Sequence, residues 1–165
     1  MRRSARMLFV AMMVGLGAPA IAHADTLAAG RAAYARADYV GAARLLIPLA
    51  ERGNAAAQAL LGFMYANGQG VPQGYEVATY WYRLAAEQGD TTAQYLLGLM
   101  YDKGFGVPLD DVAAHMWLNL AAAHAPPRTR EYYSRLRDAV ASKMSAGQIA
   151  EAQWRAQEWA ARPRL

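Results

Sequence analysis

The chain has 165 residues, of which 55% are hydrophobic and 18% charged, and it contains no cysteine. The lack of cysteine excludes disulfide bonds and thiol catalysis, so packing alone must stabilise the fold. The composition is rich in Ala and Leu and poor in Val and Ile, which favours helix over sheet. The length fits one domain with a hydrophobic core.

Residues 1–24 have the pattern of a secretory signal peptide. Three arginines precede an apolar run at 7–16 that is too short to cross a bilayer, and Ala22-His23-Ala24 is typical of a cleavage site. We expect cleavage after Ala24 and a mature protein in the periplasm or outside the cell, with no membrane span. An uncleaved membrane anchor is the alternative.

The net charge of +4 says little about partners. After removal of the predicted signal, 14 basic and 13 acidic side chains remain, so nucleic acid is not an expected partner. Residues 25–125 hold six basic and nine acidic side chains, whereas residues 126–165 hold eight and four. We interpret this asymmetry as solvated helix faces, with a binding patch as the alternative.

The sequence repeats with a period of 36 residues. Residues 57–86 and 93–122 are identical at 16 of 30 positions, and such a period is typical of stacked helix pairs. The shared positions that we take as structural are Gly62, Tyr65, Gly68, Gly70, Pro72 and Trp81 in the first copy, and Gly98, Tyr101, Gly104, Gly106, Pro108 and Trp117 in the second.

Helix caps and breaks predict eight helices in chain order. Asn54, Asp90 and Asp110 are good N-caps, and the first glycine of each Gly-x-Gly-Val-Pro phrase suits the left-handed end of a helix. The phrase lacks the lysine and hydroxyl of a phosphate loop, so it predicts a joint between helices. The expected helices are 27–36, 39–52 (with a kink or irregular end at Pro48), 55–67, 75–88, 91–103, 111–124, 127–143 and 146–161.

These elements group into a solenoid and a cap. A degenerate leading pair occupies 25–53, two repeats occupy 54–89 and 90–125, and residues 126–165 form C-terminal capping helices. Solenoid ends require such covers.

The phrases AQALLGFMYANGQGVPQGYEVATYWYRLAAEQGD and AQYLLGLMYDKGFGVPLDDVAAHMWLNLAAAHA resemble the Sel1-like repeat, a relative of the tetratricopeptide repeat. The tail MSAGQIAEAQWRAQEW also resembles the closing helix of exported bacterial members. The resemblance implies an all-α, right-handed solenoid of stacked antiparallel helix pairs. It also implies an adaptor that binds another protein, as a peptide or helix, without a cofactor.

Comparison of the two copies indicates a candidate binding surface. Positions that differ on the first helices fall on one face at helical spacing, and first helices line the concave side of tetratricopeptide-like solenoids. The candidates for partner contact are Phe63, Tyr95, Leu99, Asp102 and Lys103. Contact with a neighbouring helix of the same chain is an equal alternative.

The second helices also differ on one face. Val112 and Met116 are apolar where the earlier copy is polar, so we expect the C-terminal helices to cover them. In the earlier copy, Arg83 and Glu87 have the spacing of a surface ion pair.

Motifs for catalysis were sought and are missing, so an enzyme is not expected. The sequence has no H-E-x-x-H, G-x-S-x-G or S-x-x-K with K-T-G. Asp111 and His115 are four residues apart on one helix, which is a possible spacing for a metal pair. An acid in the first turn beside a surface histidine is more common, and we expect that arrangement. Trp81 and Trp117 are equivalent, which favours inter-helix core over a sugar platform.

The sequence therefore predicts an exported, non-catalytic adaptor. The alternatives are a cell-envelope factor that binds peptidoglycan or wall enzymes, and a stabilising role in a larger complex. Because some secreted relatives are linked to penicillin binding, a hydrolase of β-lactam-like substrates is a remote alternative.

Overall fold

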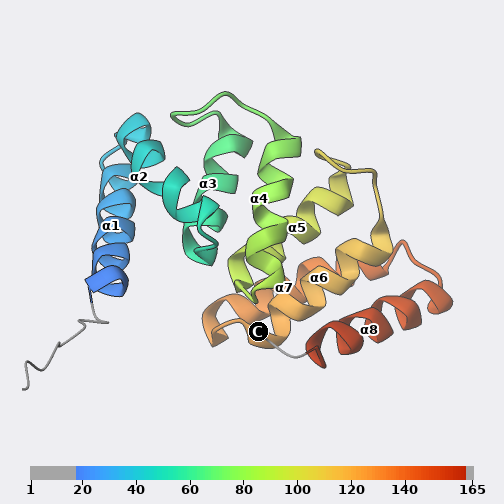
Figure 1. Ribbon diagram of the computed structural model, residues 1–165. Coiled ribbons are helices and arrows are strands. Elements are labelled where there is room, and N and C mark those ends of the chain that lie inside the picture. The colour runs from blue at the N-terminus through green and yellow to red at the C-terminus, as the bar shows by residue number, and fades with distance from the viewer. Residues whose placement is uncertain (1–17, 163–165) are drawn as a thin grey trace, which may run out of the picture.

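The computed structural model describes residues 18–162, and these fold into eight α helices that stack in chain order (Figure 1). The all-α prediction is confirmed, and most helix ends agree with it within two residues. The helices are α1 (Ala18–Ala35), α2 (Tyr39–Glu51), α3 (Ala55–Asn67), α4 (Tyr75–Glu87), α5 (Thr91–Lys103), α6 (Asp111–His124), α7 (Pro127–Ala141) and α8 (Ala146–Ala160).

The first helix differs most from its prediction. It begins at Ala18 and not at 27, because the segment before Leu27 is rich in alanine and its one proline, Pro19, lies in the first turn, where a helix tolerates proline. The predicted cleavage site after Ala24 therefore lies inside α1, while the apolar run 7–16 lies outside the described residues. In the next helix, Pro48 does not end α2, which continues to Glu51.

Side-chain caps begin the helices as the sequence predicts. Asn54, Asp90 and Asp110 each accept a hydrogen bond from the backbone N–H three residues on, at 2.8–2.9 Å. Ser145 and Gln148 form a complete capping box. Gly74 begins α4 without a side-chain cap, so the first repeat starts its second helix with less support than Asp110 gives the second repeat.

The two glycines of each repeated phrase have different roles. The first, Gly68 or Gly104, ends a helix in the left-handed conformation, at φ 65° or 68°. The second, Gly70 or Gly106, also has a positive φ, but it lies against the backbone of the preceding helix pair. A Cβ on Gly106 would lie 2.3 Å from the carbonyl carbon and oxygen of Tyr75, so only glycine fits there.

The residue between these glycines strengthens the same junction. Phe105 stacks on Tyr75 with ring centroids 4.8 Å apart, and its carbonyl accepts a hydrogen bond from the Thr79 hydroxyl at 3.1 Å. In the earlier copy, Gln69 accepts from the Tyr34 hydroxyl at 2.8 Å. Each joint thus binds its repeat to the one before it.

Small and buried polar residues hold neighbouring helices together. Gly62 and Gly98 let the first helix approach the second, since a Cβ there would lie 2.7 Å from the Tyr82 ring or 2.8 Å from Leu118. Gln58 crosses between repeats, and its buried amide donates to the Ala50 carbonyl at 3.0 Å. The same carbonyl, at the end of α2, also accepts from the backbone N–H of Gly53 at 3.0 Å, so the Gln58 amide adds a link between repeats at this helix end.

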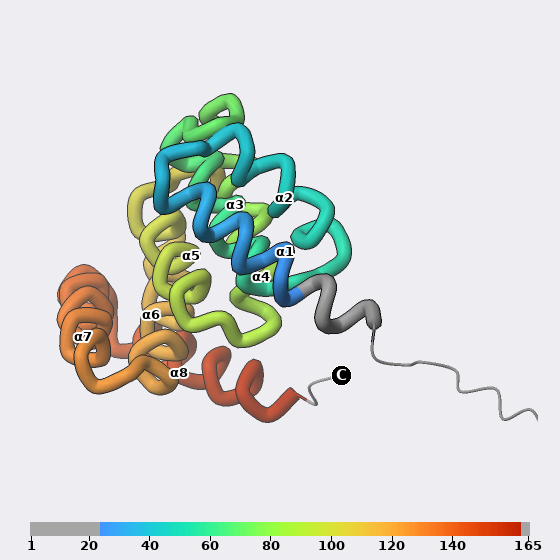
Figure 2. Tube along the Cα trace, turned by 90° about the vertical axis from the view of Figure 1, so that its left-hand side faces the viewer, coloured from blue at the N-terminus to red at the C-terminus, as the bar shows by residue number. Residues whose placement is uncertain are grey.

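The C-terminal helices close the array. Both α7 and α8 pack on α6, at the end of the molecule away from α1 (Figures 1 and 2). Met116 is half-buried and Trp117 buried, and Trp159 of α8 contacts Trp117 edge-to-face at 5.9 Å. Met116 packs against the apolar cluster that contains Trp159, and Val112 is half-buried, so cover of both residues by the C-terminal helices stays a prediction.

The junction glycines predict a matched pair of stability effects. Gly106→Ala should destabilise the protein by about 2–4 kcal/mol, because a left-handed alanine costs about 1–2 kcal/mol and the new methyl group strikes backbone. Gly53 also has a positive φ, 90°, but no atom lies within 4 Å of an added Cβ. Gly53→Ala should therefore lower the free energy of unfolding only by the about 1–2 kcal/mol of a left-handed alanine. Urea denaturation followed by circular dichroism measures both, and equal losses would contradict the close-contact role.

Candidate functional site

A groove of about 480 Å³ crosses the first helices of three successive pairs. Its floor is apolar, because Ala59, Leu60 and Leu96 present small or aliphatic side chains where α3 meets α5. Phe63 is 37% exposed beside this floor. The complete lining is Arg31, Tyr34, Ala56, Ala59, Leu60, Phe63, Asp90, Thr92 and Leu96.

The groove has one aromatic wall and a charge of each sign. Tyr34 meets Phe63 edge-to-face, with ring centroids 6.4 Å apart, and its hydroxyl bond to Gln69 fixes the ring. Arg31 is exposed on α1. Asp90 contributes a carboxylate from the start of α5, where it also caps the helix. An apolar floor with few oriented polar groups is typical of a binding site.

The corresponding space in the next repeat is filled. Tyr95 occupies the position of Ala59, and it stacks on Tyr133 of α7 at 4.6 Å and contacts Tyr132 at 5.9 Å. Burial, followed by the hydrogen bond to Tyr132, raises the pKa of Tyr95 above its ordinary value. The change from alanine to tyrosine therefore closes one groove and leaves the other open.

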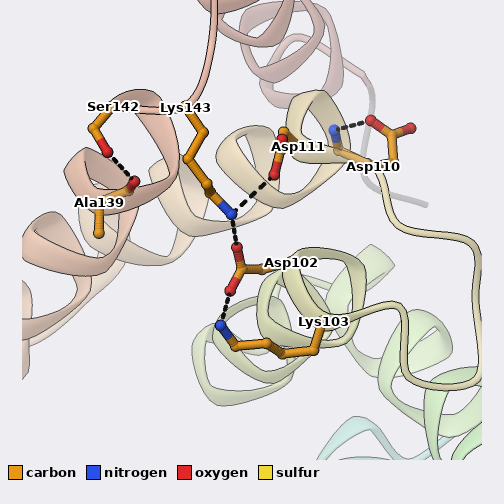
Figure 3. Close-up of polar contacts among 8 residues, drawn as sticks. Asp102, Lys103, Asp110, Asp111, Ala139, Ser142 and Lys143 are labelled. Atoms are coloured by element: carbon orange, nitrogen blue, oxygen red, sulfur yellow. Dashed lines mark hydrogen bonds and ion pairs between the residues drawn. The ribbon is translucent and has the colours of Figure 1, made fainter.

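Asp102 also contacts the C-terminal helices. Its side chain is only 9% exposed and binds Lys143, whose ammonium lies between Asp102 and Asp111 of α6 (Figure 3). Lys103 adds a second ion pair at 2.8 Å. Burial alone would raise the pKa of Asp102, but the two lysines outweigh it and hold that pKa below its ordinary value.

The structure thus divides the five candidate residues. Phe63 lies in the open groove, whereas Tyr95 and Asp102 make the contacts within the chain that the alternative interpretation describes. Leu99 is half-buried on α5, and Lys103 is exposed beside Asp102. None of these four lines the groove.

Comparison of the copies missed several groove residues. Leu60 and Leu96 agree between the repeats, so a search among differing positions did not select them, but both are half-buried and form the floor. Arg31 and Tyr34 lie in the degenerate leading pair, which has no counterpart to compare. The spacing of Leu60 and Phe63 on one helix face was the available signal.

His115 is buried, contrary to the expected surface histidine. It is 3% exposed on α6, its Nδ1 has no hydrogen-bond partner, and burial followed by the charge of Arg137 lowers its pKa. Asp138, also on α7, acts in the opposite direction. The nearby Asp111 binds Lys143, and residues 18–162 contain no group of three side chains placed to hold a metal ion.

The expected surface pair on α4 is also wrong. Arg83 donates to the Tyr101 hydroxyl at 3.0 Å, and no ion pair with Glu87 forms in the described chain. Tyr101 lies in the last turn of α5, the first helix of the next repeat, so Arg83 reaches across to that repeat. The contact therefore adds to the junction between repeats.

Family models settle what the repeat is. The Sel1 repeat matches residues 55–90 and 91–125, the two copies whose joints and groove are described above. The chain carries two Sel1 repeats. Repeats of this kind typically mediate protein interactions and are usually non-catalytic.

Solved structures of Sel1-repeat proteins share the fold. One is a protective antigen of uropathogenic Escherichia coli strains with an SLR fold, at 28% identity and a TM-score of 0.77 over 83% of this chain. Another is a Sel1-repeat protein from Oxalobacter formigenes, at 35% identity and a TM-score of 0.61 over 67% of this chain. This chain spans 29% and 45% of those proteins.

Two further findings concern curated relatives and membrane spans. No curated protein matches the chain. Among the helices of the described residues, none is long and apolar enough to cross a membrane.

The Asp102–Lys143 pair should couple α5 to the C-terminal helices by about 1 kcal/mol in a double-mutant cycle of Asp102→Asn and Lys143→Met, since Asp102 is largely buried but Lys143 is 46% exposed. The control is the Glu151–Arg155 pair on α8, which is exposed and should give about 0.3–0.5 kcal/mol. The coupling should vanish as the pH falls through the lowered pKa of Asp102. Equal coupling energies in the two cycles would show that the Asp102–Lys143 pair is no stronger than an ordinary surface ion pair.

Burial of His115 predicts acid sensitivity below neutral pH. The unfolded chain binds a proton near pH 6.5, and the folded chain does so only at lower pH, so stability falls as the pH drops below 6.5. His115→Leu should flatten the stability profile between pH 7 and pH 5 without loss at pH 7, because it also removes an unpaired buried nitrogen. Urea denaturation across this range measures the change. An unchanged profile would assign the acid response to other groups.

Proposed function

We propose that this protein is an exported, non-catalytic adaptor that binds a peptide or helical segment of another protein in the groove between α1, α3 and α5. The observation that carries the proposal is the exposed Phe63 beside an apolar floor. The two Sel1 repeats support a role in protein binding, because repeats of this kind typically mediate protein interactions.

The groove chemistry favours a segment with an apolar anchor. A leucine or aromatic side chain would pack on Leu60 and Leu96, with Phe63 and Tyr34 covering its edge. Arg31 would bind an acidic side chain next to the anchor, and Asp90 would oppose one at the other end. Apolar residues spaced by three or four positions on a helix fit this arrangement.

Export is a separate part of the proposal. It is supported by the arginine-led apolar run and the Ala22-His23-Ala24 site. N-terminal sequencing of the protein from its native host tests it, with Asp25 as the expected first residue.

Selection of peptides displayed on phage tests the binding proposal. Peptides enriched on the purified protein should carry an apolar anchor near an acidic residue, and Phe63→Ala should weaken their binding at least tenfold by removing the exposed groove wall. Calorimetry on the selected peptides gives the affinities.

Trp154→Ala is the matched control, because Trp154 is an aromatic side chain 59% exposed on α8, outside the groove lining. It should leave peptide affinity unchanged within twofold. Peptides that tolerate Phe63→Ala but lose affinity on Trp154→Ala would move the binding surface to the C-terminal helices.

A further inference from the structure

A second and larger hollow lies on the other set of helices. It has a volume of about 820 Å³ and lies where the C-terminal ends of α2, α4 and α8 approach one another. This volume is within the range of about 300–1,000 Å³ typical of small-ligand sites. Phe63 and the other lining residues of the groove on the first helices do not take part in it.

The hollow has an aromatic wall that the fold leaves uncovered. Tyr80 is 57% exposed and meets Trp81 edge-to-face at 5.1 Å, and Trp81 is itself half-buried. In the next repeat the equivalent residues are Met116 and Trp117; Trp117 packs on Trp159 of α8, and Met116 packs against the same apolar cluster. The C-terminal helix thus covers this face in one repeat and stops beside it in the other.

Polar groups of both signs surround these rings. Glu51 from the end of α2 and Glu87 from the end of α4 are exposed at the hollow, and Arg162 faces it from beyond α8. None of the ion pairs found within residues 18–162 involves these three side chains. Because all three side chains are exposed at the hollow, they can reach a ligand bound there.

The floor is fixed by amides. Gln88 donates to the Gln58 side chain at 2.7 Å and to the Leu84 carbonyl at 3.1 Å, and Gln58 donates to the Ala50 carbonyl. This network connects α2, α3 and α4, so the floor of the hollow is formed by amide side chains that already have hydrogen-bond partners. A preformed site loses less entropy on binding than a mobile one.

The mixture of groups selects a class of ligand. Arg162 opposes a cation, and the two carboxylates oppose an anion. A neutral sugar satisfies both kinds of group, because each hydroxyl both donates and accepts. The C–H face of a pyranose ring also packs on an aromatic face, whose π electrons carry negative charge.

We propose that this hollow is a binding site for a neutral oligosaccharide, with Tyr80 as the stacking platform, Trp81 behind it, and Glu51, Glu87 and Arg162 bonding to hydroxyl groups. This proposal is independent of the peptide groove, because the two sites share no lining residue and the two ligands would contact different sets of helices. The protein would then connect a glycan to a protein partner.

Calorimetry of the purified protein with three tetrasaccharides tests the proposal: the β-1,4 tetramer of N-acetylglucosamine, cellotetraose and maltotetraose. At least one should bind, with quenching of tryptophan fluorescence. Tyr80→Ala should weaken that binding at least tenfold, and Glu87→Gln about three- to tenfold, since both side chains are exposed and their loss leaves the core intact.

Trp154→Ala again serves as the control and should change sugar affinity less than twofold, because Trp154 lies outside this hollow as well. Spermidine provides the cationic comparison. No binding of any tetrasaccharide at millimolar concentration would overturn the proposal. So would equal affinity in the Tyr80→Ala protein, or binding of spermidine in place of the sugars.

Discussion

The stacking of the helix pairs depends on the contact between the second glycine of each joint and the backbone of the preceding pair. At Gly106 a Cβ would lie 2.3 Å from the Tyr75 carbonyl, and at Gly70 the same distance separates it from Tyr39. Because two backbones approach this closely, the stacking of one pair on the next is fixed at the loop end of the helices. The spacing of α1, α3 and α5, and with it the open groove, follows from that stacking.

One residue decides where the groove ends. Ala59 leaves space between α3 and α5, whereas Tyr95 at the equivalent position fills the space between α5 and α7 by stacking on Tyr133. Asp102 then holds the end of α7 through Lys143. The two repeats are thus alike in their joints and opposite in their outer surfaces, so one presents a binding surface while the other receives the C-terminal cap.

The 36-residue period, the N-caps and the glycine phrases were sufficient to predict the helices and their stacking, because these features act within a repeat or between identical neighbours. The candidate site was harder to predict. Residues that differ between copies were taken as free to bind a partner, but Tyr95 and Asp102 differ because α7 and α8 replace a further repeat as their neighbour. His115 was misjudged for the same reason, since α7, which carries Arg137 and Asp138, packs on the helix that holds it. Internal comparison detects a change of neighbour but does not identify that neighbour.

Amide hydrogen exchange with and without a bound peptide tests most directly whether the groove between the first helices is the working surface. Slower exchange should be confined to α1, α3 and the first half of α5, where Tyr34, Phe63 and Leu96 line the groove. Slower exchange confined to α7 and α8, with α3 unchanged, would contradict this and assign partner binding to the basic C-terminal helices.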